Sequence, residues 1–90
     1  MTTYIVTFEV NDLSRKNAVK KKMRDYYSGV CPIHGNCWAI QSDDTPAQIR
    51  EYLDNDLTST DRIFVIRTGT HAAWRNTYGE DNSKWLKERL

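Results

Sequence analysis

Alternating and helical patterns of apolar residues follow one another along the chain, and their order constrains the fold more than any other feature. The first alternation spans 4–10 and has one apolar face, formed by Tyr4, Val6, Phe8 and Val10. This run of β-branched and aromatic residues predicts a strand. A helix is predicted from about 15 to 28, with Ser14 as its N-cap and Gly29 as its stop. Its predicted buried stripe contains Val19, Met23, Tyr26 and Tyr27.

Two strands and a second helix are predicted in the middle of the chain. The first strand, over 30–35, is a short irregular edge strand, because Pro32 cannot donate to a sheet ladder. The second, over 36–42, places Trp38 and Ile40 on one face. The helix start is typical of a capping box with proline in the first turn, formed by Thr45, Pro46 and Gln48. The buried stripe of this helix is predicted to contain Ile49, Tyr52, Leu53 and Leu57.

The last strand, over 62–68, is apolar on both faces, so neither face is suited to water. A short helix capped by Ser83 is predicted over 83–90, and the segment 71–74 is ambiguous between strand and turn. This order of elements predicts one α/β (α+β) domain over 1–90. We expect a ferredoxin-like βαββαβ sandwich with a C-terminal extension, whose helices lie on one face of a four-stranded antiparallel sheet.

The opposite face of that sheet has no predicted cover. It would carry Ile5, Thr7 and one face of the strand over 62–68. Small domains bury only about 60% of the surface of the unfolded chain, so an uncovered apolar face favours association. We therefore expect the C-terminal tail or a second copy of the chain to cover this face, with a C2 homodimer as the simplest solution.

The composition is typical of a folded soluble protein, with 39% hydrophobic and 28% charged residues. No apolar run approaches the roughly 20 residues that span a bilayer, and the first residues lack the pattern of a signal peptide. These features predict a cytoplasmic protein that does not enter membranes. Cys31 and Cys37 are accordingly expected to be free thiols.

The net charge of +1 conceals a basic segment over 13–40 and an acidic segment over 41–61. The clustered cations of the basic segment are Arg15, Lys16, Lys20, Lys21, Lys22 and Arg24. Such a cluster either holds the phosphates of a nucleic acid or forms a solvated helix face. Aromatic side chains beside it would stack nucleobases if they were exposed, although we expect most of them to fill the core.

Three stretches of the chain resemble the stand-alone SinR-like small proteins, relatives of the small CRISPR-associated nuclease at the centre of the spacer-integration complex. They are the strand end Thr7-Phe8-Glu9-Val10-Asn11, the strand Cys37-Trp38-Ala39-Ile40 before a Thr-Pro-capped helix, and the tail Ala72-Ala73-Trp74 with Lys84-Trp85-Leu86-Lys87. The resemblance implies a ferredoxin-like homodimer and a metal-dependent endonuclease acting on RNA or DNA. It also implies that one carboxylate of each subunit, at the end of the first strand, holds Mg²⁺ or Mn²⁺.

In this chain the implied metal ligand and catalytic residue is Glu9. The family usually has Asp after an aromatic residue at this position, and Glu is one methylene longer, whereas Mg²⁺ demands near-octahedral geometry at about 2.0–2.1 Å. Asn11 shares the predicted face of Glu9, and Asp12 follows in the loop. One interpretation is that the carboxylates hold a metal that activates water. The other is that Glu9 lies at a rim, Asn11 and Asp12 form a turn, and the protein is a non-catalytic dimeric module that binds nucleic acid or another protein.

Cys31, His34 and Cys37 form a C-x2-H-x2-C pattern, and His71 would complete a set of four zinc ligands. The usual zinc frameworks pair two well-spaced ligand units, so packed thiols and a surface histidine are the favoured interpretation and zinc is not expected. A Cys/His nucleophilic site is expected even less, because the sequence identifies no third group that would orient the pair.

Overall fold

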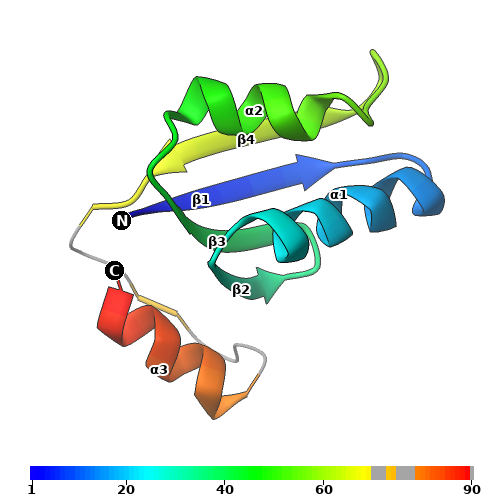
Figure 1. Ribbon diagram of the computed structural model, residues 1–90. Helices are drawn as coiled ribbons and strands as arrows, with labels where there is room; N and C mark the ends of the chain where they lie inside the picture. The colour runs from blue at the N-terminus through cyan, green and yellow to red at the C-terminus, as the bar shows by residue number, and fades with distance from the viewer. Residues whose placement is uncertain (70–72, 75–78, 90) are drawn as a thin grey trace.

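The computed structural model describes residues 1–69, 73–74 and 79–89 (Figure 1). Each predicted helix and strand is present. In chain order they are β1 (Thr2–Glu9), α1 (Leu13–Tyr26), β2 (Gly29–His34), β3 (Cys37–Ser42), α2 (Pro46–Asp54), β4 (Arg62–Arg67) and α3 (Glu80–Arg89). The four strands form one antiparallel sheet in the order β2-β3-β1-β4. The central pair is therefore β3 and β1, and β2 and β4 are edge strands.

The inner face of the sheet is covered by α1 and α2, which lie side by side over it (Figure 1). Tyr4, Val6 and Phe8 of β1 and Trp38 and Ile40 of β3 are buried there as predicted, together with Val19 and Met23 of α1 and Ile49 and Leu53 of α2. Val10 lies just beyond β1 and is only partly buried. The predicted capping box of α2 is confirmed, because the Thr45 amide donates to Gln48 Oε1 at 2.8 Å and the Gln48 amide donates to Thr45 Oγ1 at 3.2 Å. This cap orients α2 so that its apolar stripe meets the sheet.

The edge strand β2 confirms the prediction made from Pro32, since the pairing with β3 shifts register between Pro32 and His34. Three other predictions are wrong. Asp12, not Ser14, is the N-cap of α1, because the backbone of Asp12 is extended and its Oδ2 accepts from the Arg15 amide at 2.9 Å. Ser83 does not cap α3, because that helix begins three residues earlier, at Glu80.

Tyr26 is the third correction, because its side chain is not buried in the core. The last helical residue of α1 is Tyr26, and the extended backbone of Tyr27 turns that ring into the core instead. Tyr26 is 55% exposed, whereas Tyr27 is 5% exposed. Of the two tyrosines in the predicted stripe, only Tyr27 is therefore buried, because the chain leaves the helix at this point.

The outer face of the sheet is partly covered by α3, which lies on the side opposite α1 and α2 (Figure 1). Leu86 is buried against Cys31 of β2 and Ala39 of β3. The side-chain amide of Asn82 donates to the Pro32 carbonyl at 3.0 Å, and the Thr3 hydroxyl donates to the Arg89 carbonyl at 3.0 Å. The C-terminal helix α3 therefore covers part of the sheet face for which the sequence predicts no other helix.

The half of the outer face formed by β4 and the adjoining part of β1 is not covered by α3. The exposed fractions of Phe64 and Ile66 are 59% and 48%. Their cross-strand neighbours on β1 are Thr7 and Ile5. We call Phe64, Ile66 and Thr7 the open strip. It confirms the prediction that one apolar face of the last strand is exposed in a single copy of the chain.

Candidate functional site

Glu9 is the last residue of β1, and the alternation of the strand points it to the outer face, away from buried Phe8. Its cross-strand partner is Arg62, and Glu9 Oε1 lies 2.7 Å from Arg62 Nη1. Both side chains are largely exposed, at 61% and 77%. An exposed pair of this kind is worth about 0–1 kcal/mol, so a ligand or a second chain can displace it.

A shallow hollow of about 700 Å³ surrounds this pair. It is lined by the end of β1, the start of β4 and the turn before β3, with Thr7, Phe8, Glu9, Asn36, Asp61, Arg62, Ile63 and Phe64. The Asn36 carbonyl accepts from the Phe8 amide at 3.0 Å and holds that turn against β1. The hollow combines a carboxylate, a guanidinium and the exposed ring of Phe64, and it is continuous with the open strip at Phe64 and Thr7.

Asp61 organises the loops behind this hollow. Its carboxylate accepts from Arg15 Nε at 2.9 Å and from the backbone amides of Asn11 and Thr58, each at 3.0 Å. The hydrogen bond from Arg15, followed by those two amides, holds the pKa of Asp61 far below its usual range. Asp61 therefore ties the β1–α1 loop and the start of α1 to the α2–β4 loop. The sequence analysis gives Asp61 no role, although Thr58 and Asp61 have the spacing of a capping box, in which the acidic side chain accepts from the amide three residues earlier.

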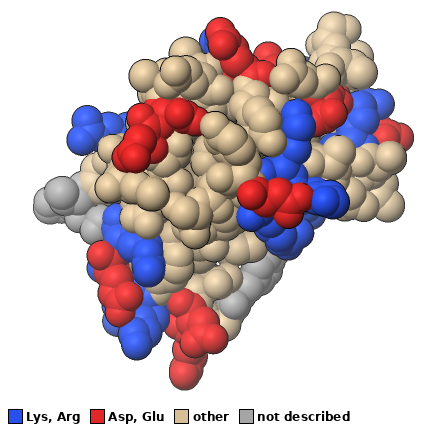
Figure 2. Space-filling view, in the orientation of Figure 1, with Lys and Arg blue, Asp and Glu red and all other residues tan. Residues whose placement is uncertain are grey.

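The six predicted nucleic-acid contacts do not form one free basic surface. Four of them are engaged within the chain. Arg15 pairs with Asp61, Lys21 with Asp25 at 2.8 Å and Lys22 with Asp56 at 2.8 Å, while the Arg24 guanidinium stacks 4.7 Å from the Trp38 ring centroid. Lys16 and Lys20 have no ion pair within the described residues. On the face shown in Figure 2, acidic and basic side chains are interspersed.

The basic helix and Glu9 also lie on different layers of the molecule. The packing face of α1 meets the inner face of the sheet through Val19 and Met23, whereas Glu9 belongs to the outer face. Arg15 comes nearest to the hollow, through Asp61, which lines it. The structure therefore connects the Glu9 hollow to the start of α1 and not to its lysines.

The other oxygen ligands that the sequence offered near Glu9 have structural partners. Asn11 Nδ2 donates to the Thr60 carbonyl at 2.9 Å, and Asp12 caps α1. Among the residues that the structure describes, no three His, Cys, Asp or Glu side chains converge as a metal-binding group. Of the two carboxylates that line the hollow, Asp61 is engaged by Arg15 and Glu9 faces Arg62. This donor set does not fit a divalent cation by itself.

The cysteines and His34 lie on β2 and β3 in different surroundings. Cys31 is buried beneath α3, where its Sγ lies 3.8 Å from the Asn82 carbonyl, while Cys37 is half-buried and His34 is exposed. Both thiols are free, and burial raises the pKa of each. The thiolate is the form that attacks and ligates, so these surroundings make both sulfurs less reactive at neutral pH. His71 lies outside the described residues.

A scan of the sequence against protein-family models finds no matching family, and a search of curated proteins finds no significant match. Within the part of the chain that the structure describes, no helix has the length and apolar character needed to cross a lipid bilayer.

Proposed function

We propose that the protein is a cytoplasmic, ferredoxin-like homodimer and a metal-dependent endonuclease that cleaves RNA or DNA. The order β2-β3-β1-β4 with two helices on one face supports a ferredoxin-like arrangement. The resemblance of three sequence stretches to the SinR-like proteins and the small CRISPR-associated nucleases supports the activity. One observation carries the assignment of the site: Glu9 ends β1 on the outer face, beside a strip of apolar surface that the chain leaves open.

A two-fold axis through the open strip would bring the Glu9 residues of two copies toward one another. Burial of Phe64 and Ile66 against the same residues of a second copy would remove apolar surface from water, which favours association by about 25 cal/mol per Å². Two carboxylates then face a shared space, and each Arg62 can move to a substrate phosphate. In this assembly the two Glu9 carboxylates would be the residues that hold Mg²⁺ or Mn²⁺, which would supply activation of water and neutralisation of charge on the phosphate.

The chain's own residues have three roles in this proposal. Glu9 would hold the cation and orient the attacking water, and Arg62 would contact the phosphate that is cleaved. Asp61 and Arg15 keep the loops behind the hollow in place. Lys16 and Lys20 contact the nucleic acid further from the cleaved bond. The remaining basic side chains keep their internal partners.

The deciding experiment incubates purified protein with labelled RNA and labelled DNA across a series of divalent metals. Glu9→Gln removes the negative charge and keeps the shape, so we expect cleavage to fall at least about 100-fold. Glu51→Gln changes an exposed glutamate of α2, and its rate should equal that of the unchanged protein. Mn²⁺ binding measured by calorimetry gives a second readout and should be lost in Glu9→Gln. Equal cleavage by the Glu9→Gln and Glu51→Gln variants would remove Glu9 from the site.

A second candidate is a non-catalytic dimeric module that binds nucleic acid or another protein. The 2.7 Å pair between Glu9 and Arg62 favours it, because a carboxylate held by a guanidinium is a weaker cation ligand. This candidate predicts no turnover with any metal. Binding to nucleic acid should weaken steeply as salt rises. A salt-insensitive complex would instead indicate a protein partner.

A further inference from the structure

A second hollow, of about 360 Å³, lies where the C-terminal end of α1 meets the loop between β3 and α2. Met1 also lines it, so it is at the opposite end of β1 from Glu9. Its lining includes the aromatic and polar residues Tyr26, Tyr27, Ser28, Asp43 and Asp44. Two phenol rings and two carboxylates therefore meet at one place, far from the proposed nuclease site.

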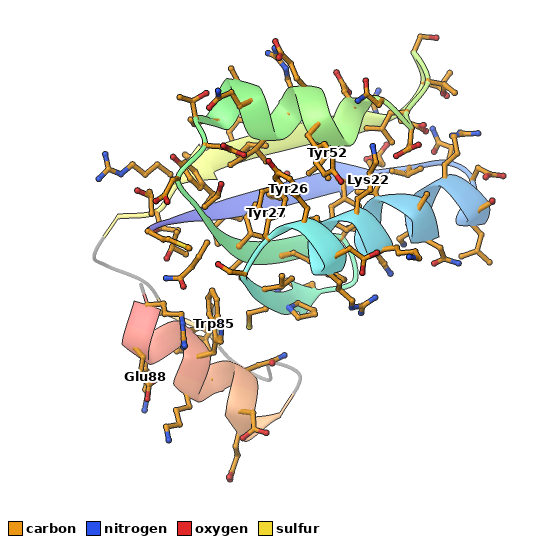
Figure 3. All side chains as sticks on the ribbon, viewed as in Figure 1. Lys22, Tyr26, Tyr27, Tyr52, Trp85 and Glu88 are labelled. Carbon is orange, nitrogen blue, oxygen red and sulfur yellow. The ribbon has the colours of Figure 1, made fainter. Side chains whose placement is uncertain are left out.

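Tyr26 and Tyr27, which line the hollow, form a ring cluster with Tyr52 between α1 and α2 (Figure 3). The rings of Tyr26 and Tyr27 are nearly perpendicular, with centroids 4.9 Å apart, and Tyr26 lies 4.5 Å from Tyr52. The faces of such rings attract cations. The cluster already contacts one cation, because Lys22 Nζ lies 4.5 Å from the centroid of the Tyr52 ring. Tyr26 is 55% exposed, so part of its ring is open to a second cation.

The charge around the hollow is negative. Asp43 and Asp44 have no ion pair with any described residue. The last carbonyls of α1 end beside them and add a partial negative charge. Arg24, in the last turn of α1, is stacked on Trp38. Among the residues that line the hollow, the positive charge is the α-ammonium of Met1, and the carboxylates of Asp43 and Asp44 outweigh it.

The hydroxyl of Tyr27 is an independent sign of a missing partner. Tyr27 is only 5% exposed, and its hydroxyl has no hydrogen-bond partner among the described residues. Buried polar atoms are nearly always paired, so this one calls for a donor or acceptor supplied from outside the chain. Burial, and then the charge of nearby Asp44, raise the pKa of Tyr27 well above its ordinary value. The hydroxyl therefore stays protonated, and Tyr27 and Asp44 both line the hollow.

We propose that this hollow binds a small primary alkylammonium ion, with the Asp44 carboxylate as its counter-ion and the Tyr26 ring as its wall. Three N–H donors of such an ion match the carboxylate and the phenol oxygen of Tyr27, while its carbon chain packs on the ring of Tyr26. A metal ion fits less well, because no group of three ligating side chains converges in the described residues. The site is independent of the proposed nuclease activity.

The test is an NMR titration of the full chain, without nucleic acid, at constant ionic strength. Two primary amines are compared: putrescine, a free diamine, and Nα-acetyl-lysine-N-methylamide, a lysine side chain as a protein presents it. Saturable shifts are expected at the rings of Tyr26 and Tyr27 and at the amides of Asp43 and Asp44. The tighter of the two probes identifies the source of the ammonium group. Tetramethylammonium, which has no N–H donor, should bind more weakly than both.

The amine affinities of matched variants distinguish a specific binding site from general attraction between opposite charges. Asp44→Asn keeps the size of the side chain and should weaken binding about fivefold. Asp54→Asn, on the exposed end of α2, should leave binding unchanged. Tyr26→Phe keeps the ring face and should bind normally, whereas Tyr26→Leu should weaken binding about threefold. Shifts that do not saturate, or equal effects of Asp44→Asn and Asp54→Asn, would overturn the proposal.

Discussion

The two faces of the sheet differ in how completely helices cover them. The inner face is sealed by two helices, and ten buried residues form its core, including Trp38, Met23, Ile49 and Leu53. The outer face is sealed by one helix through three buried residues, Cys31, Ala39 and Leu86, and leaves the open strip exposed. Packing on the inner face therefore stabilises the fold, whereas the outer face keeps exposed surface that can contact a second chain or a ligand.

The largest expected difference between the faces comes from the same substitution made once on each. Leu53→Ala opens a cavity in the closed inner core and should lower the free energy of unfolding by about 3–5 kcal/mol. Leu86→Ala removes an equally buried side chain, but α3 can settle onto the sheet, so the loss should be about 2 kcal/mol. Urea denaturation at one pH measures both. Equal losses would contradict a rigid inner layer and a compliant outer one.

A charge placed in the open strip tests whether the outer face meets a second copy. Phe64→Glu should raise the dissociation constant of the proposed dimer at least about 100-fold, because a carboxylate would be buried without a partner. Its folding stability should change little, since Phe64 is 59% exposed in one copy. Light scattering across a dilution series measures the molar mass. Thr60→Glu, in the exposed loop before β4, is the control and should leave the mass unchanged. A chain that is monomeric at all concentrations would remove the dimer.

Asp61 joins the loops beside the Glu9 hollow, and its contribution should depend on pH. The pKa of Asp61 is lowered in the folded state, so its stabilising effect is present above the unfolded value of about 3.9 and is lost as pH falls below it. Asp61→Asn should therefore lower the urea midpoint at about pH 7 and have a much smaller effect at about pH 2. Asp54→Asn serves as the comparison on an exposed site. If Asp61→Asn lowered the urea midpoint by the same amount at both pH values, the shape of the side chain would matter and its charge would not.

The smallest effect is expected at the Glu9–Arg62 pair itself. Because both side chains are largely exposed, Glu9→Gln should change the free energy of unfolding by no more than about 0.5 kcal/mol. The same variant is expected to lower cleavage at least about 100-fold under the proposed function, so the contrast between the two measurements separates a functional role from a structural one. A large loss of stability would show that the pair holds β1 and β4 together.

Much of the architecture could be predicted because local patterns and long-range packing agree. The alternation of β1, the capping box at Thr45 and the edge position of Pro32 each have a local physical cause, and each appears in the structure. The ends of α1 could not be predicted as well. Asp12 competes with Ser14 for the cap, and the exit of the chain at Tyr27 decides which tyrosine is buried. Both the choice of N-cap and the choice of buried tyrosine depend on the path of the chain just outside α1.

The candidate site was predicted less completely than the fold. The position of Glu9 on the outer face follows from strand alternation, but its pairing with Arg62 depends on the register between β1 and β4. The basic residues of α1 form a cluster along the sequence, yet most of them are engaged by acidic or aromatic side chains from α1 itself, β3 and the loop between α2 and β4. Distant partners cannot be identified from a helical pattern, because the pattern specifies only the helix's own face.

By itself, the sequence determined the order of the elements, the inward residues of the strands and the amphipathic face of α2, because these depend on neighbours a few residues apart. The tertiary structure alone decided that α3 covers β2 and β3 and leaves β4 open, and that Tyr26 is exposed while Tyr27 is buried. Those outcomes arise from competition among surfaces that are remote in sequence, and only the folded chain brings them into contact.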